Sequence, residues 1–152
     1  MSELLTHEEY KSLEASLDFP QSPFIDGKYH TGSGELMTTI NPSTGMEITS
    51  ITTASDEDVD LAVEKAREAF DQGRWCRLHP SERKDILIKL CKLLTRNQKE
   101  LAVMESLDSG KPIRDCVQID LPETIHTIKW HAELIDKIYD QTAPSGDEAL
   151  SI

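Results

Sequence analysis

The sequence is short of basic residues, of aromatic side chains and of long apolar runs. Its 152 residues hold 16 lysines and arginines against 28 acids, which gives a formal net charge of -12 at pH 7. A field of this sign repels phosphate-rich partners unless a local basic run overrides it, and the chain contains no such run. We therefore expect neither nucleic acid nor a membrane as a partner.

The scarcity of apolar runs and the spacing of the cysteines indicate in which cell compartment the protein is expected. The most apolar stretch, DILIKLCKLL at residues 85–94, is interrupted by Lys89 and Lys92, and residues 1–20 have neither a basic start nor a sustained apolar segment. No CxxC spacing occurs among the three cysteines, Cys76, Cys91 and Cys116. An odd number of thiols without a paired spacing is typical of reduced cysteines. We expect a cytoplasmic protein.

Local patterns in the first third of the chain predict a capped helix and short strands. Thr6 and Glu9 have the spacing of a capping box, which predicts a helix through about Leu17. Residues rich in β-branched side chains flank two turn signals, Asp26-Gly27 and the segment 41–45. This pattern predicts two or three antiparallel strands near 23–30, 36–40 and 46–53.

The rest of the chain predicts amphipathic helices. Ser55 caps a helix whose apolar residues recur at helical spacing from Val59 to Phe70. Pro80 opens a second helical tract with an apolar stripe that begins at Ile86, is interrupted near Asn97 and ends at Gly110. A last tract is predicted at 123–139, where Pro122 either kinks the helix or begins it.

Two glycine-containing segments have some features of nucleotide-binding loops. The Gly-Ser-Gly at 32–34 leads into a predicted strand, whereas a dinucleotide fingerprint leads into a helix. Gly110-Lys111 is followed by Pro112, where a phosphate-binding loop needs Ser or Thr, and it ends a helix. The negative end of a helix dipole disfavours phosphate and favours Lys111. We interpret both segments as turns.

The histidines and cysteines show no catalytic arrangement. His126 and His131 are five residues apart, about 140° around a helix, where paired zinc ligands need a separation of four. No nucleophile context of the Gly-x-Ser-x-Gly type occurs. The residues alone thus indicate an acidic, helix-rich segment with a hairpin and no visible active site.

Six segments nevertheless resemble one known family in their order and spacing. FIDGKY, INPSTG, SDEDVDLAVEKAREAF, ERKDILIKLCKLL, ESLDSGKP and IKWHAELIDKIY resemble the start of the NAD(P)-dependent aldehyde dehydrogenases. The resemblance covers residues 22–152. Within the family, GKPIRD and the last of the six segments are most similar to the gamma-glutamyl-gamma-aminobutyraldehyde dehydrogenases of putrescine breakdown, with the betaine aldehyde dehydrogenases as the nearest alternative.

The resemblance implies an α/β, Rossmann-like fold for the whole enzyme, of which this segment is mostly α-helical with an N-terminal β-hairpin. It implies an N-terminal extension at 1–21 and the N-terminal part of the cofactor-binding domain at 22–142. It further implies the start of an oligomerisation arm at 143–152. A homodimer or homotetramer is expected for such an enzyme.

The chemistry implied by the resemblance needs residues that this sequence does not contain. In the family a cysteine thiolate attacks the aldehyde, hydride passes to NAD or NADP, and a glutamate-activated water releases the acid. The nucleophile stands in a Gly-Gln-x-Cys context that is absent here. We expect none of the three cysteines to be that nucleophile, no cofactor-binding residue in the chain, and no activity of the chain alone.

The resemblance does imply one site, for a monovalent cation such as potassium or sodium. Its ligands would be the carboxylate of Asp108 and the backbone carbonyls of Thr39 and Ile40. A hard cation prefers oxygen ligands, and unpaired carbonyls lie at the end of a helix. The alternative is that Asp108 pairs with Lys111 or caps neighbouring backbone.

Two functions from different classes remain open at this stage. The chain is either the N-terminal portion of an aldehyde dehydrogenase or a non-catalytic short paralogue that acts as a helical interaction module. The ending partway into a predicted strand favours the first. It predicts that the apolar faces of the helices containing Val59 and Ile86 lack partners.

Overall fold

The computed structural model describes residues 4–137 and begins with a helix fixed by its cap. Helix α1 (His7–Ala15) starts after Thr6, whose hydroxyl accepts the backbone N–H of Glu9 while the Glu9 carboxylate accepts the N–H of Thr6. The predicted capping box is therefore confirmed. Tyr139 and the segment 143–152, the latter predicted to begin an oligomerisation arm, lie outside the described residues.

Four short strands form two separate antiparallel hairpins: β1 (Phe24–Ile25) with β2 (Lys28–Tyr29), and β3 (Leu36–Ile40) with β4 (Glu47–Thr52). The predicted strand at 23–30 is thus itself a hairpin. Asp26 and Gly27 both have positive φ, 51° and 79°, as a two-residue hairpin turn requires. The β3–β4 register shifts between Thr39 and Ile40.

The predicted helices of the middle of the chain are confirmed. Helix α2 (Asp56–Asp71) begins at the cap Ser55. Helix α3 (Pro80–Arg96) has its proline in the first turn, and helix α4 (Gln98–Ser109) follows directly after Asn97. Gly110 ends α4 in the left-handed conformation, with φ of 75°.

The last helical region starts earlier than the predicted 123–139. A short helix α5 (Ile113–Asp115) continues into a π-helical turn, η1 (Cys116–Asp120), and then into α6 (Leu121–Leu134). The N–H of Leu121 donates to the carbonyl of Cys116, five residues back. Pro122 lies in the first turn of α6, but the helical residues of α5 and η1 precede it without a break, so it does not begin the helical region.

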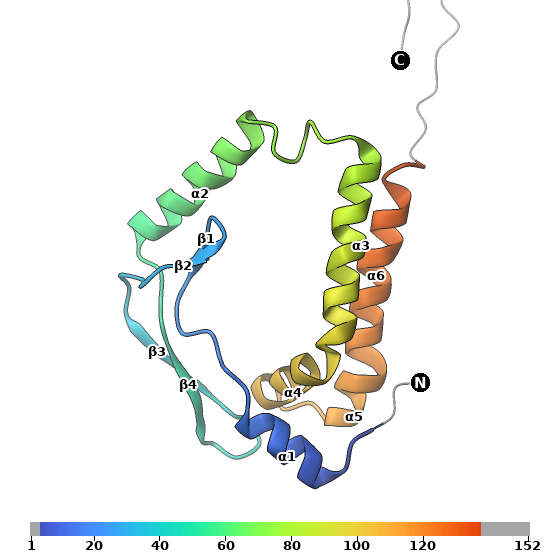
Figure 1. Cartoon of the computed structure of the whole chain (residues 1–152). Coiled ribbons are helices and arrows are strands. Elements are labelled where there is room, and N and C mark those ends of the chain that lie inside the picture. The colour runs from blue at the N-terminus through green and yellow to red at the C-terminus, as the bar shows by residue number, and fades with distance from the viewer. Residues whose placement is uncertain (1–3, 138–152) are drawn as a thin grey trace, which may run out of the picture.

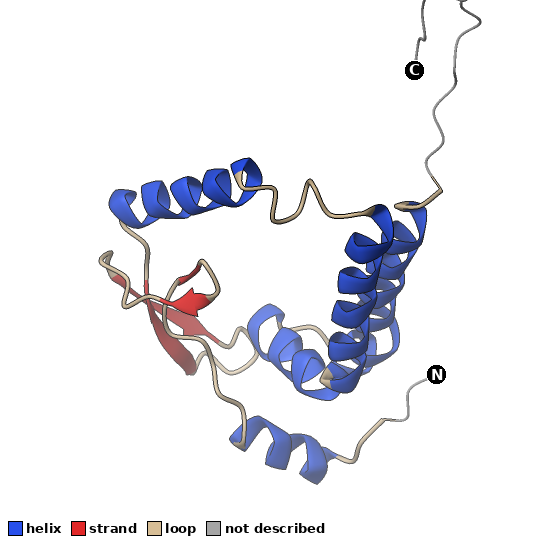
Figure 2. Ribbon diagram, turned by 45° about the horizontal axis from the view of Figure 1, so that its top comes forward, coloured by secondary structure: helices blue, strands red, loops and turns tan. Residues whose placement is uncertain are grey.

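The elements surround a central opening (Figure 1). Helices α3 and α6 lie side by side on one side, the hairpins and α2 lie on the other, and α1 and α4 close the lower end. Figure 2 shows the same separation of the sheets from the α3–α6 pair. The buried core of the helical corner is small and is formed by Ala102, Cys116, Val117 and Leu121.

The predicted unpartnered apolar faces are present. Val59 on α2 is 52% exposed and Ile86 on α3 is 43% exposed. Among residues 4–137 no helix combines the length and apolar character needed to cross a membrane. The cytoplasmic location and the domain boundaries at 21 and 142 stay predictions.

Candidate functional site

A cavity of about 380 Å³ lies between the end of α4 and the β3–β4 hairpin, and it contains two of the three predicted cation ligands. Asp108 and Glu105 line it from the helix, and Thr39 lines it from β3. The remaining lining side chains are mostly apolar: Phe19, Pro20, Ile48, Thr49, Ile51, Leu101 and Met104. The fold therefore brings together Asp108 and Thr39, which are 69 positions apart in the sequence.

The Asp108 side chain does not cap the C-terminal end of α4. Two serine hydroxyls form the side-chain hydrogen bonds there. The Ser109 hydroxyl donates to the Glu105 carbonyl at 2.6 Å, and the Ser106 hydroxyl donates to the Lys111 carbonyl at 2.7 Å. Lys111 pairs with Glu105 and Asp120 instead of Asp108. Within residues 4–137 the exposed Asp108 carboxylate makes no hydrogen bond or ion pair, so the alternative role for Asp108 is not the arrangement in this structure.

Thr39 and Ile40 differ in how they meet this cavity. The Thr39 hydroxyl donates to the Thr49 carbonyl at 3.1 Å, so its side chain is engaged within the hairpin. Ile40 is 47% exposed and is not among the described residues that line the cavity. The register shift between these two residues locally disrupts the ladder. The structure thus brings Asp108 and Thr39 to the cavity and leaves Ile40 outside its lining.

A second and larger cavity, of about 750 Å³, lies beside η1 and the start of α6. Three acids line it, Glu105, Asp120 and Glu123, together with Lys111. The Lys111 ammonium is 2.9 Å from Asp120 and 3.5 Å from Glu105. Its hydrogen bond to Asp120 raises the pKa of Lys111. The acids exceed the one base, so the wall carries a net negative charge.

Glu105 belongs to both cavities, since it lines the Asp108 cavity as well as the larger one. The sequence alone did not identify the Lys111–Asp120 pair. Lys111 lies in the loop between α4 and α5, and Asp120 is nine positions later at the end of η1, so the path of the chain through this loop and turn brings them together. That the negative end of α4 favours Lys111 stays a prediction, because the contacts of the Lys111 ammonium are with the carboxylates of Asp120 and Glu105.

The Gly-Ser-Gly segment is a turn that is hydrogen-bonded to the first turn of α2. We call this set of hydrogen bonds, from Ser33 and Ser55 to the Asp58 carboxylate, the clasp. The backbone N–H and the hydroxyl of Ser33 donate to the Asp58 carboxylate at 3.0 and 2.8 Å. The backbone of Ser55 donates to the same carboxylate. These hydrogen bonds, the one from Ser55 first, lower the pKa of Asp58 to about 2.

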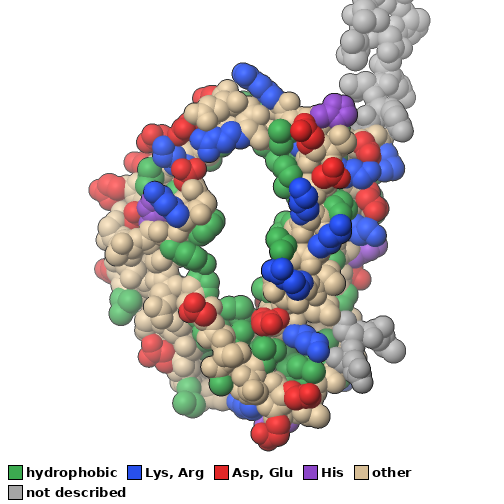
Figure 3. Space-filling view, in the orientation of Figure 1, with side chains coloured by type: hydrophobic (Ala, Val, Ile, Leu, Met, Phe, Trp, Pro, Cys, Tyr) green, Lys and Arg blue, Asp and Glu red, His purple; other side chains and the backbone are tan. Residues whose placement is uncertain are grey.

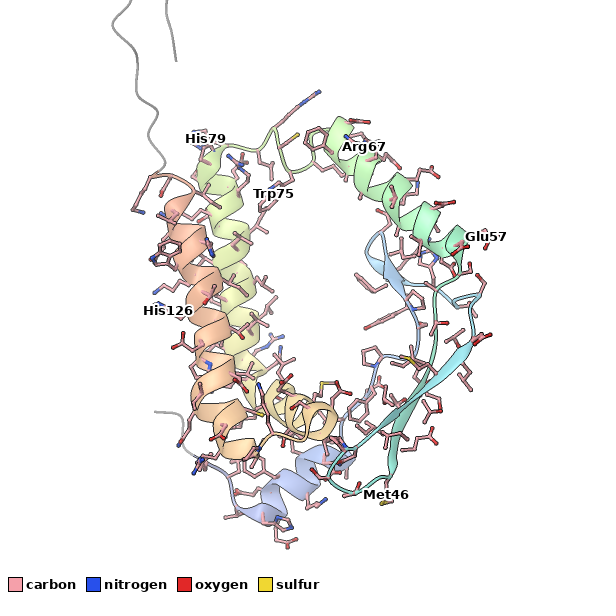
Figure 4. The ribbon with its side chains drawn as sticks, turned by 180° about the vertical axis from the view of Figure 1, so that it is seen from behind. Met46, Glu57, Arg67, Trp75, His79 and His126 are labelled. Atoms are coloured by element: carbon pink, nitrogen blue, oxygen red, sulfur yellow. The ribbon has the colours of Figure 1, made fainter. Side chains whose placement is uncertain are left out.

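The remaining candidate ligands do not form a metal centre. No group of three or more His, Cys, Asp or Glu side chains that could hold a metal occurs in the described part of the chain. His126 lies on the outer side of α6, away from the opening (Figure 4), and the ring of His131 stacks edge-on against Trp130.

The three cysteines lie in different surroundings. Cys116 is fully buried, and burial raises the pKa of its thiol. Cys91 is buried against α6, where its thiol approaches the Ile125 carbonyl at 3.8 Å. Cys76 is exposed, and its thiol donates to the Phe70 carbonyl at 3.3 Å. A nucleophilic thiol needs a lowered pKa and access to substrate, and Cys116 has neither.

Comparison with known sequences finds relatives that are named as aldehyde dehydrogenases. It is 53% identical to the aminoacetaldehyde dehydrogenase of Pseudomonas aeruginosa, over 100% of this chain and 31% of that protein. It is 36% identical to the NADP/NAD-dependent aldehyde dehydrogenase PuuC of Escherichia coli, over 90% of this chain and 28% of that protein. The chain thus spans about a third of the length of these curated relatives.

Solved structures give the same result for the fold. An indole-3-acetaldehyde dehydrogenase variant from P. syringae, in complex with NAD+, matches with a TM-score of 0.92 and 36% identity over 97% of this chain and 30% of its own. A gamma-glutamyl-gamma-aminobutyraldehyde dehydrogenase from Burkholderia cenocepacia matches with a TM-score of 0.89 and 34% identity, over 93% of this chain and 29% of its own. Because the family model "Aldehyde dehydrogenase family" also matches residues 29–152, the chain belongs to the aldehyde dehydrogenase family.

Proposed function

We propose that this chain is the N-terminal part of an NAD(P)-dependent aldehyde dehydrogenase, which oxidises an aldehyde to the carboxylic acid. The observation that carries the proposal is the match of the whole chain, in sequence and in fold, to such enzymes. The assembled enzyme is proposed to be a homodimer or homotetramer. Its location is proposed to be the cytoplasm.

The chain supplies structure to this reaction and not the reacting groups. NAD(P) accepts the hydride in the family, but the described residues do not fit a dinucleotide. The Gly-Ser-Gly turn leads into β3, and the first turn of α2 carries three acids, Asp56, Glu57 and Asp58, which repel phosphate. The sequence also lacks the Gly-Gln-x-Cys context of the nucleophile. We therefore propose that the 152 residues alone have no dehydrogenase activity.

The proposed substrate is an aldehyde with an amino or amide nitrogen. Two similar proteins are named for such substrates, aminoacetaldehyde and gamma-glutamyl-gamma-aminobutyraldehyde. The larger cavity supports the proposal, because its acids outnumber its one base and Lys111 is already paired with two of them. Glu123 makes no ion pair within residues 4–137 and is the acid free to accept a substrate ammonium.

The monovalent cation is proposed to bind in the cavity at the end of α4. The unpaired carboxylate of Asp108 supports this role, and so does the position of Thr39 in the lining of the same cavity. Potassium or sodium would take the carboxylate oxygen of Asp108 and the carbonyl oxygens of the two hairpin residues. The pairing of Lys111 with Glu105 and Asp120 keeps its positive charge from neutralising Asp108.

A chimaera tests the proposed reaction. This chain replaces the aligned segment of the P. aeruginosa aminoacetaldehyde dehydrogenase, and formation of the reduced nicotinamide is followed with aminoacetaldehyde, gamma-glutamyl-gamma-aminobutyraldehyde and an uncharged aliphatic aldehyde. We expect activity, with a preference for the first two. A folded chimaera that oxidises no aldehyde would overturn the proposal, and the relative with the segment deleted is the inactive control.

The same chimaera tests the substrate class. Glu123→Gln removes one negative charge from the wall of the larger cavity. We expect KM to rise about tenfold for the cationic aldehyde and to change little for the uncharged one, because only the ammonium gains from the carboxylate. Equal changes in KM for the two aldehydes would show that Glu123 does not recognise the ammonium group of the substrate.

A further inference from the structure

Lys111 is the only basic side chain among the described residues that line the larger cavity, beside η1 and the start of α6. Its ammonium lies between two carboxylates, 2.9 Å from Asp120 and 3.5 Å from Glu105. Glu123, the third acid of the lining, makes no ion pair in the described part of the chain. Figure 3 shows acidic and basic side chains among hydrophobic ones at the lower end of the opening, where α4 meets the α3–α6 pair. The cavity therefore contains one built-in ammonium and one acid without such a partner.

The backbone that carries the Lys111 side chain is fixed on both sides. The N–H of Lys111 donates to the Ser109 hydroxyl at 3.2 Å, and the Lys111 carbonyl accepts the Ser106 hydroxyl at 2.7 Å. The next residue, Pro112, has its φ fixed by its ring. Because the backbone is held at one end of the side chain and the ammonium is held by two carboxylates at the other, the positive charge has a defined position.

Lys111 carries its charge at neutral pH. Its hydrogen bond to Asp120 raises the pKa of Lys111 above the ordinary value of 10.5, and the negative charge of Glu105 acts in the same direction. The ammonium therefore satisfies much of the capacity of Asp120 and Glu105 to bind a second cation.

We propose that Lys111 occupies the place of a second ligand ammonium, and that it thereby restricts the larger cavity to ligands with one ammonium group. The inference rests on the proposed function, in which this cavity receives the nitrogen of the substrate. Glu123 takes the single ammonium of such a ligand. A second ammonium on the same ligand meets Asp120 and Glu105 already bonded to Lys111, and the Lys111 charge repels it.

Charge and not space is the basis of this restriction. The cavity volume of about 750 Å³ lies in the range of about 300–1,000 Å³ that is common for small-molecule sites, so a ligand with two ammonium groups fits. The Lys111 ammonium is a compact charge on a flexible chain of methylene groups, as is each end of a linear diamine. The apolar side chains that can contact the methylene groups of a ligand are Leu94, Leu101, Ile119, Leu121 and Ile128.

Binding of amines to the 152-residue chain tests the inference without any need for catalysis. Propylamine and a series of linear diamines from propanediamine to hexanediamine are titrated at neutral pH, and each Kd is measured from NMR chemical shifts. In the unsubstituted chain the diamines should bind within about twofold of propylamine, because a second ammonium finds no free carboxylate. In Lys111→Ala the best diamine should bind about tenfold more tightly than propylamine, since its second ammonium reaches Asp120 and Glu105.

Three further variants separate the charge of Lys111 from a structural role. Lys111→Arg keeps the charge and should behave as the unsubstituted chain does. Lys65→Ala is the matched control, because the Lys65 ammonium lies 2.8 Å from Glu68 and neither residue lines the cavity. Lys111→Ala combined with Glu123→Gln should lose the preference for the diamine, since only one of the two ammonium places then remains.

A second measurement covers a loss of stability in Lys111→Ala, in which two carboxylates lose their shared partner. The best diamine should raise the urea midpoint of Lys111→Ala more than that of the unsubstituted chain, because the diamine supplies the missing ammonium to the folded state. Lys111→Gln replaces the alanine variant in the titrations if circular dichroism shows that the alanine variant has lost helical content.

The outcomes distinguish this inference from the proposed function. An unchanged ratio of the two Kd values in Lys111→Ala, an equal change in Lys65→Ala, or no amine binding by any of these proteins would overturn the role of Lys111. If the chimaera oxidises amino aldehydes while the ratio is unchanged, the charge restriction alone is wrong. If the chimaera oxidises no aldehyde while Lys111→Ala gains the preference for the diamine, the proposed reaction is wrong and the role of Lys111 in ammonium binding stands.

Discussion

Gly110, at the end of α4, lies so close to Pro42 in the β3–β4 turn that an added Cβ would be 2.8 Å from the Pro42 Cγ. Gly110 also has a φ of 75°. Both the backbone conformation and the close approach require glycine here. This contact fixes the distance between the helix end that carries Asp108 and the hairpin that carries Thr39.

Substituting Gly110 should therefore cost more than substituting a glycine that has only the backbone constraint. Gly110→Ala is expected to lower the free energy of unfolding by about 2–4 kcal/mol, from the left-handed conformation and the clash with Pro42 together. Gly45→Ala is the control, since Gly45 has a φ of 71° with no atom within 4 Å of the added Cβ. Urea denaturation measures both. Equal losses of unfolding free energy from Gly110→Ala and Gly45→Ala would show that Pro42 moves aside at no cost in free energy.

The hydrogen bonds that the Asp58 carboxylate accepts should make the free energy of unfolding depend on pH in the acid range. The pKa of Asp58 is about 2 in the folded chain, against an ordinary value of 3.8. A lowered pKa stabilises the folded state fully above about pH 4, and this contribution is lost as the pH falls toward 2. The stability difference between the unsubstituted chain and Asp58→Asn should accordingly shrink between pH 5 and pH 2. A range from about pH 5 to about pH 2 brackets the ordinary and the lowered pKa of Asp58.

A neighbouring acid serves as the control for the clasp. Asp60 accepts no hydrogen bond within the described residues, so Asp60→Asn should leave the pH dependence almost unchanged. Urea midpoints for the three proteins across this range give the comparison. A constant difference between the unsubstituted chain and Asp58→Asn would show that the Ser33 and Ser55 hydrogen bonds do not persist in solution.

Much of the helical structure could be predicted because its signals are local. The cap at Ser55, the proline at position 80 and the left-handed Gly110 each mark a helix end within a few residues. The π-helical turn Cys116–Asp120 could not be predicted in this way. A π-helical turn interrupts the helical period over one turn and leaves no repeating pattern in the sequence.

The candidate site was much harder to predict than the fold. Asp108 and Thr39 belong to elements whose proximity depends on the packing of α4 against the hairpin, and only the family resemblance related them. The ion-pair partner of Lys111 could not be predicted either, because several acids lie near Lys111 in the sequence and the charge pattern does not distinguish them. The structure selects Asp120 and Glu105 and leaves Asp108 free of Lys111.

The three thiols should differ sharply in reactivity. Cys76 is exposed, whereas Cys91 is buried and Cys116 has a pKa raised by its burial. Iodoacetamide followed by peptide mass spectrometry should label Cys76 about tenfold faster or more than either of the others. In urea the three rates should converge. Labelling of Cys116 at the rate of Cys76 in the folded chain would contradict its burial and reopen it as a reactive thiol.

The proposed cation site makes a prediction that the chain alone can test. Potassium bound through Asp108 should stabilise the folded state by about 1.4 kcal/mol at ten times its Kd, since only the folded chain assembles the ligands. Urea midpoints in potassium chloride are compared with those in tetramethylammonium chloride at equal ionic strength, which cancels screening. Asp108→Asn should abolish the potassium-specific gain. Asp85→Asn, which removes an exposed acid on α3, should preserve it. A gain that survives Asp108→Asn would place the cation elsewhere.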